Sequence, residues 1–105
     1  MMIQVNTGRQ TPDSAGLTDY VEKLIHDEFD RFADRITRVE VHLTDVNSAA
    51  KSGGDDKRCQ IEVRMSGLQP LSATNHADSH ELAMNGAAGK MLRLIEATLG
   101  RLDDR

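Results

Sequence analysis

Two segments of this chain alternate strictly between apolar and polar side chains, and this pattern constrains the fold more than any other feature. The alternation runs through residues 36–46 and again through residues 58–65. The apolar positions are Val39, Val41, Leu43, Cys59, Ile61, Val63 and Met65. A period of two is typical of β-strands with one buried face and one solvated face. The chain must therefore cover one side of a sheet and leave the other side wet.

Two weaker strands extend this sheet. Residues 2–6 alternate and end before a glycine, which predicts a short first strand. Residues 71–76 form a strand that Pro70 opens, and a proline at this position suits a sheet edge. The polar segment 47–57 between the two strongest strands is expected to be a flexible loop.

A first helix is expected to begin within residues 10–14, which hold several candidate N-cap residues. These are Thr11, Asp13 and Ser14. One face of the helix is apolar and consists of Leu17, Val21, Leu24, Ile25 and Phe32, with Phe29 at its edge. Glu28 falls inside this face. Its position predicts that the helix ends early, changes register or bends the carboxylate out to solvent.

The last helix is predicted over residues 79–102, and its cations fall on one stripe. At about 100° per residue, Arg93 and Arg101 lie within about 60° of Lys90, and no carboxylate lies in that arc. The apolar arc beside the stripe consists of Met84, Ala87, Ala88, Met91, Leu94, Ile95, Leu99 and Leu102. Asp78 followed by Glu81 predicts a capping box at the helix start.

The resulting order is β-α-β-β-β-α in a single domain, residues 1–105. Because each strand has one wet face, both helices should cover the other face of a four-stranded sheet, which gives an α+β two-layer sandwich. Hairpin connections make strands two to four antiparallel. A helix between strands one and two allows these two strands to pair in parallel.

Composition narrows the function. The net charge of −4 counts against nucleic-acid binding but does not exclude it, because a phosphate responds to the local field. Aromatic residues make up 3% of the chain, which argues against base-stacking platforms and base readout. The single Cys59 suits a reducing cytoplasm and is expected to be buried. Without a signal-peptide pattern or a run of membrane-span length, we expect a cytoplasmic protein with no membrane contact.

Several stretches resemble the ribosome hibernation-promoting factors, also called ribosome-associated inhibitors or ribosomal subunit interface proteins. They are residues 3–9 (IQVNTGR), residues 17–22 (LTDYVE), residues 34–41 (DRITRVEV), and Ala83-Met84 leading to Lys90-Met91-Leu92-Arg93. The resemblance covers essentially the whole chain and implies a fold like the double-stranded-RNA-binding domain with an extra N-terminal strand. It also implies a non-enzymatic translation regulator of stationary or stressed cells. Such a protein binds small-subunit ribosomal RNA where messenger and transfer RNA would sit.

The chain departs from the family pattern in three places. The family's last helix usually carries further basic residues after the matched pair, whereas here residues 94–98 are LIEAT. The loop between strands two and three is long and contains Asp55-Asp56. The sequence ends after the last helix, so we do not expect the dimer-forming domain of the long family members. The strength of ribosome binding and the oligomeric state stay open.

The predicted RNA-binding set consists of Arg9, Arg31, Arg35, Lys90, Arg93 and Arg101. The resemblance implies roles for Arg9, Lys90 and Arg93. If the helices lie side by side, Arg31 and Arg35 could line one wall of a groove and the cations of the last helix the other. A row of such groups suits the phosphates of an RNA backbone. The alternative is a solvated helix flank with intrahelical ion pairs, such as Arg31 with Asp27.

The remaining patterns predict no catalysis. His76 and His80 are four positions apart, but His42 is the only further candidate ligand, so no metal site is expected. Without a nucleophile–base set we expect neither an enzyme nor a cofactor nor a small-molecule substrate. The alternative function is a protein-interaction module that uses the open sheet face. Its mixed charges come from Arg38, Glu40, His42, Gln60, Glu62 and Arg64.

Overall fold

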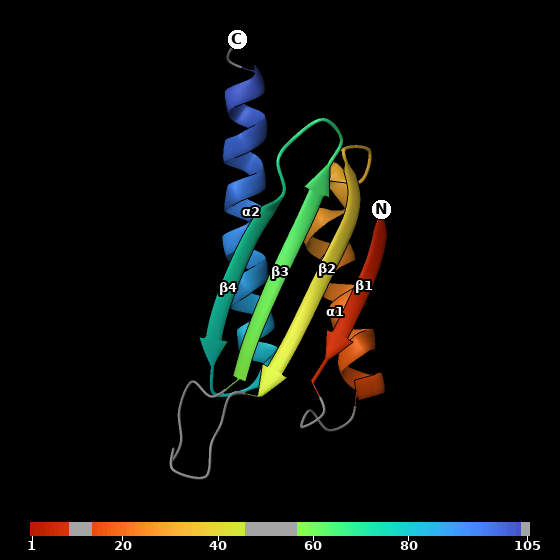
Figure 1. Ribbon diagram of the computed structural model, residues 1–105, viewed down its shortest axis with the longest axis vertical. Helices are drawn as coiled ribbons and strands as arrows, with labels where there is room; N and C mark the ends of the chain where they lie inside the picture. Colours follow the sequence, from red (N-terminus) through yellow and green to blue (C-terminus); the bar gives the residue numbers. More distant parts are fainter. Residues whose placement is uncertain (9–13, 46–56, 104–105) are drawn as a thin grey trace.

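A computed structural model describes residues 1–8, 14–45 and 57–103. Its elements are β1 (Met2–Thr7), α1 (Ser14–Phe29), the 3-10 turn η1 (Asp30–Phe32), β2 (Ile36–Asp45), β3 (Lys57–Met65), β4 (Leu71–Ala77) and α2 (His80–Asp103). Figure 1 shows this order along the chain and confirms the predicted β-α-β-β-β-α arrangement. Arg9, the N-cap candidates Thr11 and Asp13, and most of the predicted loop lie outside the described residues.

The four strands form one sheet in the order β1-β2-β3-β4. β1 pairs with β2 in parallel, with Val5 opposite Val41, because α1 carries the chain back to the same end of the sheet. β2, β3 and β4 are antiparallel neighbours. Gly67 has a φ of +76° in the turn between β3 and β4, a conformation that favours glycine. The antiparallel pairing predicted for strands two to four is confirmed, and the parallel pairing that the sequence allowed for strand one is the one that forms.

Both helices cover the same face of the sheet, so the molecule is a two-layer α+β sandwich (Figure 1). α2 packs on β3 and β4, whereas α1 lies over the β1 side of the sheet. The upper end of α2 extends beyond the ends of the strands in Figure 1. Within the described residues, no helix has the length and hydropathy needed to span a membrane.

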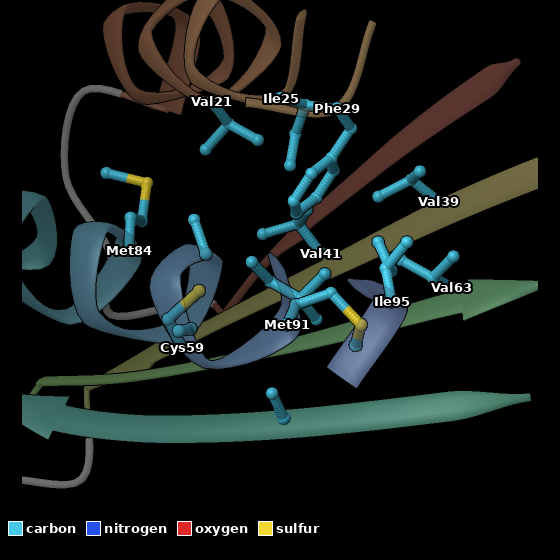
Figure 2. Close-up of a cluster of buried hydrophobic side chains, with 14 of the residues drawn as sticks. Val21, Ile25, Phe29, Val39, Val41, Cys59, Val63, Met84, Met91 and Ile95 are labelled. Atoms are coloured by element: carbon cyan, nitrogen blue, oxygen red, sulfur yellow. The ribbon is translucent and has the colours of Figure 1, made fainter. Parts of the chain in front are cut away.

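The core lies between the sheet and the helices. The alternating strand residues Val41 and Val63 point to the same layer as Ile25 and Phe29 of α1 and Met91 of α2 (Figure 2). Each of these five side chains is at most 1% exposed. Complete burial of such a side chain contributes about 1.5–3 kcal/mol to the stability of the fold. The apolar seam, by which we mean the buried contact between α2 and the sheet, therefore fixes α2 and its polar flank over β4.

Three residue assignments differ from the sequence prediction, and one alternative that the sequence left open is decided. Phe29 is 0% exposed and lies within the core rather than at its edge, whereas Leu94, expected in the apolar arc, is 38% exposed. The α-helix ends at Phe29 and continues as η1, so of the three outcomes expected around Glu28 an early end is observed. The N-cap of α2 is Ser79 rather than Asp78, because the Ser79 hydroxyl accepts a hydrogen bond from the Leu82 N–H at 3.1 Å.

Candidate nucleic-acid interface

Three cations of α2 form the basic stripe, which we define as Lys90, Arg93 and Arg101. All three side chains are exposed, and none pairs with a carboxylate in the described part of the chain. Lys90 donates from Nζ to the Thr74 carbonyl at 2.9 Å, and Arg101 donates to the Thr98 hydroxyl at 3.4 Å. Both acceptors are neutral, so the stripe keeps its full positive charge.

Five other cations of the described residues are neutralised within the fold, whereas Arg35 and Arg58 have no carboxylate partner there. The pairs are Lys23–Asp27 at 3.6 Å, Arg31–Glu96 at 2.6 Å, Arg38–Glu40 at 3.0 Å, Lys57–Asp45 at 3.1 Å and Arg64–Glu62 at 3.3 Å. An adjacent carboxylate cancels most of the field that a cation presents to a distant anion. An acidic chain can therefore still present an uncompensated positive surface on α2.

Two members of the basic stripe line a hollow between α2 and the sheet edge, which we call the β4–α2 pocket. Its volume is about 370 Å³, and its walls are Ser72, Ala73, Lys90, Arg93 and Leu94. Lys90 and Leu94 lie one helical turn apart and therefore on one face of α2. This face turns toward β4 because the apolar seam of α2 packs on β3 and β4.

Arg31 lies on the opposite flank of α2. Its Nη2 donates to Glu96 Oε2 at 2.6 Å, and its guanidinium lies 4.7 Å above the centre of the Phe32 ring. Glu96 thus faces α1, while Lys90 faces β4. The expected groove with Arg31 on one wall and Lys90 on the other is therefore wrong in its geometry. The alternative intrahelical pairing of Arg31 with Asp27 is not the one that forms either, since Asp27 pairs with Lys23.

Arg35 and Arg101 lie outside the β4–α2 pocket. Arg35 is exposed just after η1, and its backbone carbonyl accepts a hydrogen bond from the Ser66 N–H at 3.1 Å. This bond ties Arg35 to the turn between β3 and β4. The structure thus brings Lys90 and Arg93 together and leaves Arg31 and Arg35 at the end of the α1 segment. Arg9 is outside the described residues.

Sequence reasoning missed two features around α2. Ser72 and Ala73 belong to the pocket only because β4 is the edge strand beside α2, and their local sequence carries no sign of this role. Glu96 was noted as a departure from the family pattern, but its pairing with Arg31 depends on how the two helices pack. A polar link between Tyr20 and Asn85, 3.1 Å from oxygen to oxygen, joins the helices at a second place.

The open sheet face has paired charges. Arg38 and Arg64 each contact a glutamate on their own strand, Glu40 and Glu62, and His42 lies 3.7 Å from Glu40. Arg38 also donates to the Gln4 side chain. Because these groups satisfy one another, the open face presents less free charge than the basic stripe.

The Cys59 thiol and two histidines are further groups that could carry chemistry. Cys59 is 0% exposed, and burial raises the pKa of its thiol from the ordinary 9.0 to about 12. His76 lies on β4 and His80 begins α2. Among the described residues, no three His, Cys, Asp or Glu side chains gather as a metal site would require.

Residues 4–103 match the family described as sigma 54 modulation protein / S30EA ribosomal protein. The chain belongs to this family. The match confirms the resemblance to ribosomal subunit interface proteins, and a protein of this family is a ribosome-associated factor. A comparison with curated protein sequences gave no match.

Solved structures show the same fold. The Thermus thermophilus Protein Y N-terminal domain is similar with a TM-score of 0.73 and 21% identity, over 93% of this chain and 99% of that one. A ribosomal subunit interface protein from Coxiella burnetii is similar with a TM-score of 0.69 and 19% identity, over 100% of both chains. These similarities confirm the α+β sandwich.

Proposed function

We propose that this protein binds the ribosomal RNA of the small ribosomal subunit and sterically blocks the sites of messenger and transfer RNA. The observation that carries this proposal is the basic stripe, whose three cations have no carboxylate partner among the described residues of a chain with net charge −4. An unpaired cation can neutralise a phosphate without first breaking an ion pair with a carboxylate.

The spacing of the stripe suits a polyanion. Lys90 and Arg101 are eleven positions apart, which corresponds to about 17 Å along an α-helix. A row of this length can contact phosphates at several points of an RNA backbone, and such contacts fix the position of the protein without reading bases. Arg9, Arg31 and Arg35 complete the proposed set, with Arg31 available once Glu96 releases it.

No reaction is needed for this function. A folded body 51 Å long that occupies the decoding region would exclude messenger and transfer RNA by its volume. We therefore propose a non-enzymatic regulator that acts in the cytoplasm of stationary or stressed cells, as one domain and without a cofactor. Family membership supports a role on the ribosome.

Sedimentation with purified ribosomal subunits tests the proposal. We expect the protein to travel with the small subunit at low salt and to compete with transfer RNA for it. If three phosphates are neutralised, affinity should fall about 20- to 40-fold between 50 and 200 mM salt. An affinity for the small subunit that does not change with salt concentration would favour the alternative function, a protein-interaction module on the open sheet face. A lack of association at every salt concentration would contradict the ribosomal role.

A further inference from the structure

We propose that the β4–α2 pocket binds one unstacked nucleotide of single-stranded RNA, with the base against the apolar wall and the phosphate on Lys90 and Arg93. This inference rests on the proposed function, since it assigns a subsite within the same RNA-binding surface. It adds a base contact to a surface for which only phosphate contacts were expected.

The walls of the pocket have two chemical halves. Ala73 and the exposed part of Leu94 form an apolar side. Lys90 and Arg93 form a cationic side, and Ser72 completes the lining. The volume of about 370 Å³ is comparable to that of pockets that hold small ligands, roughly 300–1,000 Å³. A ligand that satisfies both halves must combine an apolar plane with an anion.

Leu94 gives the pocket its specificity for such a ligand. It is 38% exposed, and the other large hydrophobic side chains with high exposure in the described segments, Met2 and Leu82, do not line the pocket. A lone phosphate would use Lys90 and Arg93 and leave Leu94 in water. A nucleotide covers Leu94 with its base, and the Arg93 guanidinium can stack on the same base.

The hydrogen bond of Lys90 argues against an extended peptide as the occupant. Its Nζ donates to the Thr74 carbonyl on the outer edge of β4, and a peptide adding to the sheet would need that carbonyl. A lysine placed in this way protects an edge strand from further pairing. The ammonium keeps two further N–H donors for phosphate oxygens. Lys90 thus disfavours addition of a strand to β4 and leaves N–H donors free to bind an anion.

Duplex RNA is also a poor occupant, because its bases stay stacked inside the helix and only its backbone reaches the protein. Single-stranded RNA can turn a base outward into an apolar pocket. The subsite should accept different bases, since packing against Leu94 and stacking on Arg93 use the face of the base and not its edge.

Fluorescence anisotropy with a 12-nucleotide single-stranded RNA and a 12-base-pair duplex tests this inference. Leu94→Ser should lower the affinity for the single strand about tenfold and leave duplex binding and the salt dependence unchanged, because no charge is lost. The matched control Leu82→Ser, on the same helix but outside the pocket, should bind both RNAs as the parent does. Lys90→Gln with Arg93→Gln should weaken both. Thermal unfolding checks that each variant is folded.

A photo-crosslink locates the base independently of the variants. A single strand carrying 4-thiouridine should crosslink to the tryptic peptides 65–90 and 94–101, which contain Ala73 and Leu94. Equal binding of the single strand by the parent and Leu94→Ser would overturn the subsite even where the protein still travels with the small subunit. The subsite would also be overturned if Leu94→Ser lost small-subunit binding but bound the single strand unchanged. That result would mean that a side chain of a ribosomal protein, and not a base, occupies the pocket. Failure of the proposed function instead shows as no small-subunit binding by the parent protein.

Discussion

Arg31 donates a hydrogen bond to Glu96 across 65 positions of sequence, with 2.6 Å between Nη2 and Oε2. The contact joins the end of the α1 segment to α2, on the flank of α2 that faces away from the β4–α2 pocket. Both side chains are about half exposed, at 60% and 49%, so a solvent-borne anion can reach the guanidinium. In the proposed function, the carboxylate of Glu96 occupies the position on Arg31 that an RNA phosphate would take.

Removing this acid should strengthen binding. Glu96→Gln frees Arg31 and removes a negative charge from α2, so we expect several-fold higher affinity for the small subunit and a steeper salt dependence. The free energy of unfolding should fall by no more than about 1 kcal/mol, because an exposed ion pair contributes little. Binding titrations with Glu22→Gln, which removes an equal charge from α1, serve as the control. Equal affinities of the two variants would show that Glu96 does not restrain Arg31.

The close approach of α2 to β4 should be sensitive to one methyl group. A Cβ on Gly86 would overlap the side-chain amide of Asn75, which donates to the Leu82 and Ala83 carbonyls at 3.4 Å. Gly86→Ala should therefore cost about 1–3 kcal/mol in urea unfolding, since Asn75 must move and lose these contacts.

The same helix offers a control for this substitution. Gly100→Ala meets nothing within 4 Å, and alanine favours the helix, so we expect a gain of about 0.4–1 kcal/mol. If Gly86→Ala were as stable as Gly100→Ala, the packing of β4 against α2 would be looser than described.

Burial of Cys59 predicts a pH dependence of stability. Its thiol has a folded-state pKa of about 12 and an ordinary pKa of 9.0, so the unfolded chain loses its proton first as the pH rises. The contribution of this thiol to stability is complete below pH 9 and decreases between pH 9 and about 12. Urea unfolding across this range should show a steeper decline for the parent than for Cys59→Ala. Parallel declines would contradict a protonated, buried thiol.

Much of the fold could be predicted because its determinants are local. Alternation in residues 36–46 and 58–65 identified two central strands and their buried faces, and burial of Val41 and Val63 confirms it. The sequence was compatible with a parallel pairing of β1 and β2 but could not predict it, since this pairing depends on the path of α1 above the sheet. Ser79 and Asp78 are both good N-cap residues, and only the backbone geometry at the helix start decides between them.

The candidate site was less predictable because it depends on packing. Helical spacing placed Lys90 and Arg93 on one stripe of α2, and the structure brings them together in one pocket. Spacing could not say which neighbour that stripe faces, because this depends on the position of α2 over β3 and β4. The pairing of Arg31 with Glu96 has the same origin, since helix periodicity relates only residues of one helix.

The salt dependence of small-subunit binding tests the central claim most directly, because its slope counts the phosphates that the protein neutralises. Two variants that each lose two positive charges should be compared with the parent: Lys90→Gln with Arg93→Gln in the basic stripe, and Arg38→Gln with Arg64→Gln on the open sheet face. We predict that the first variant lowers the slope of log affinity against log salt by about 1.4–1.8 and that the second leaves it unchanged. An unchanged slope for the first variant with a reduced slope for the second would contradict the account and assign the contact to the sheet.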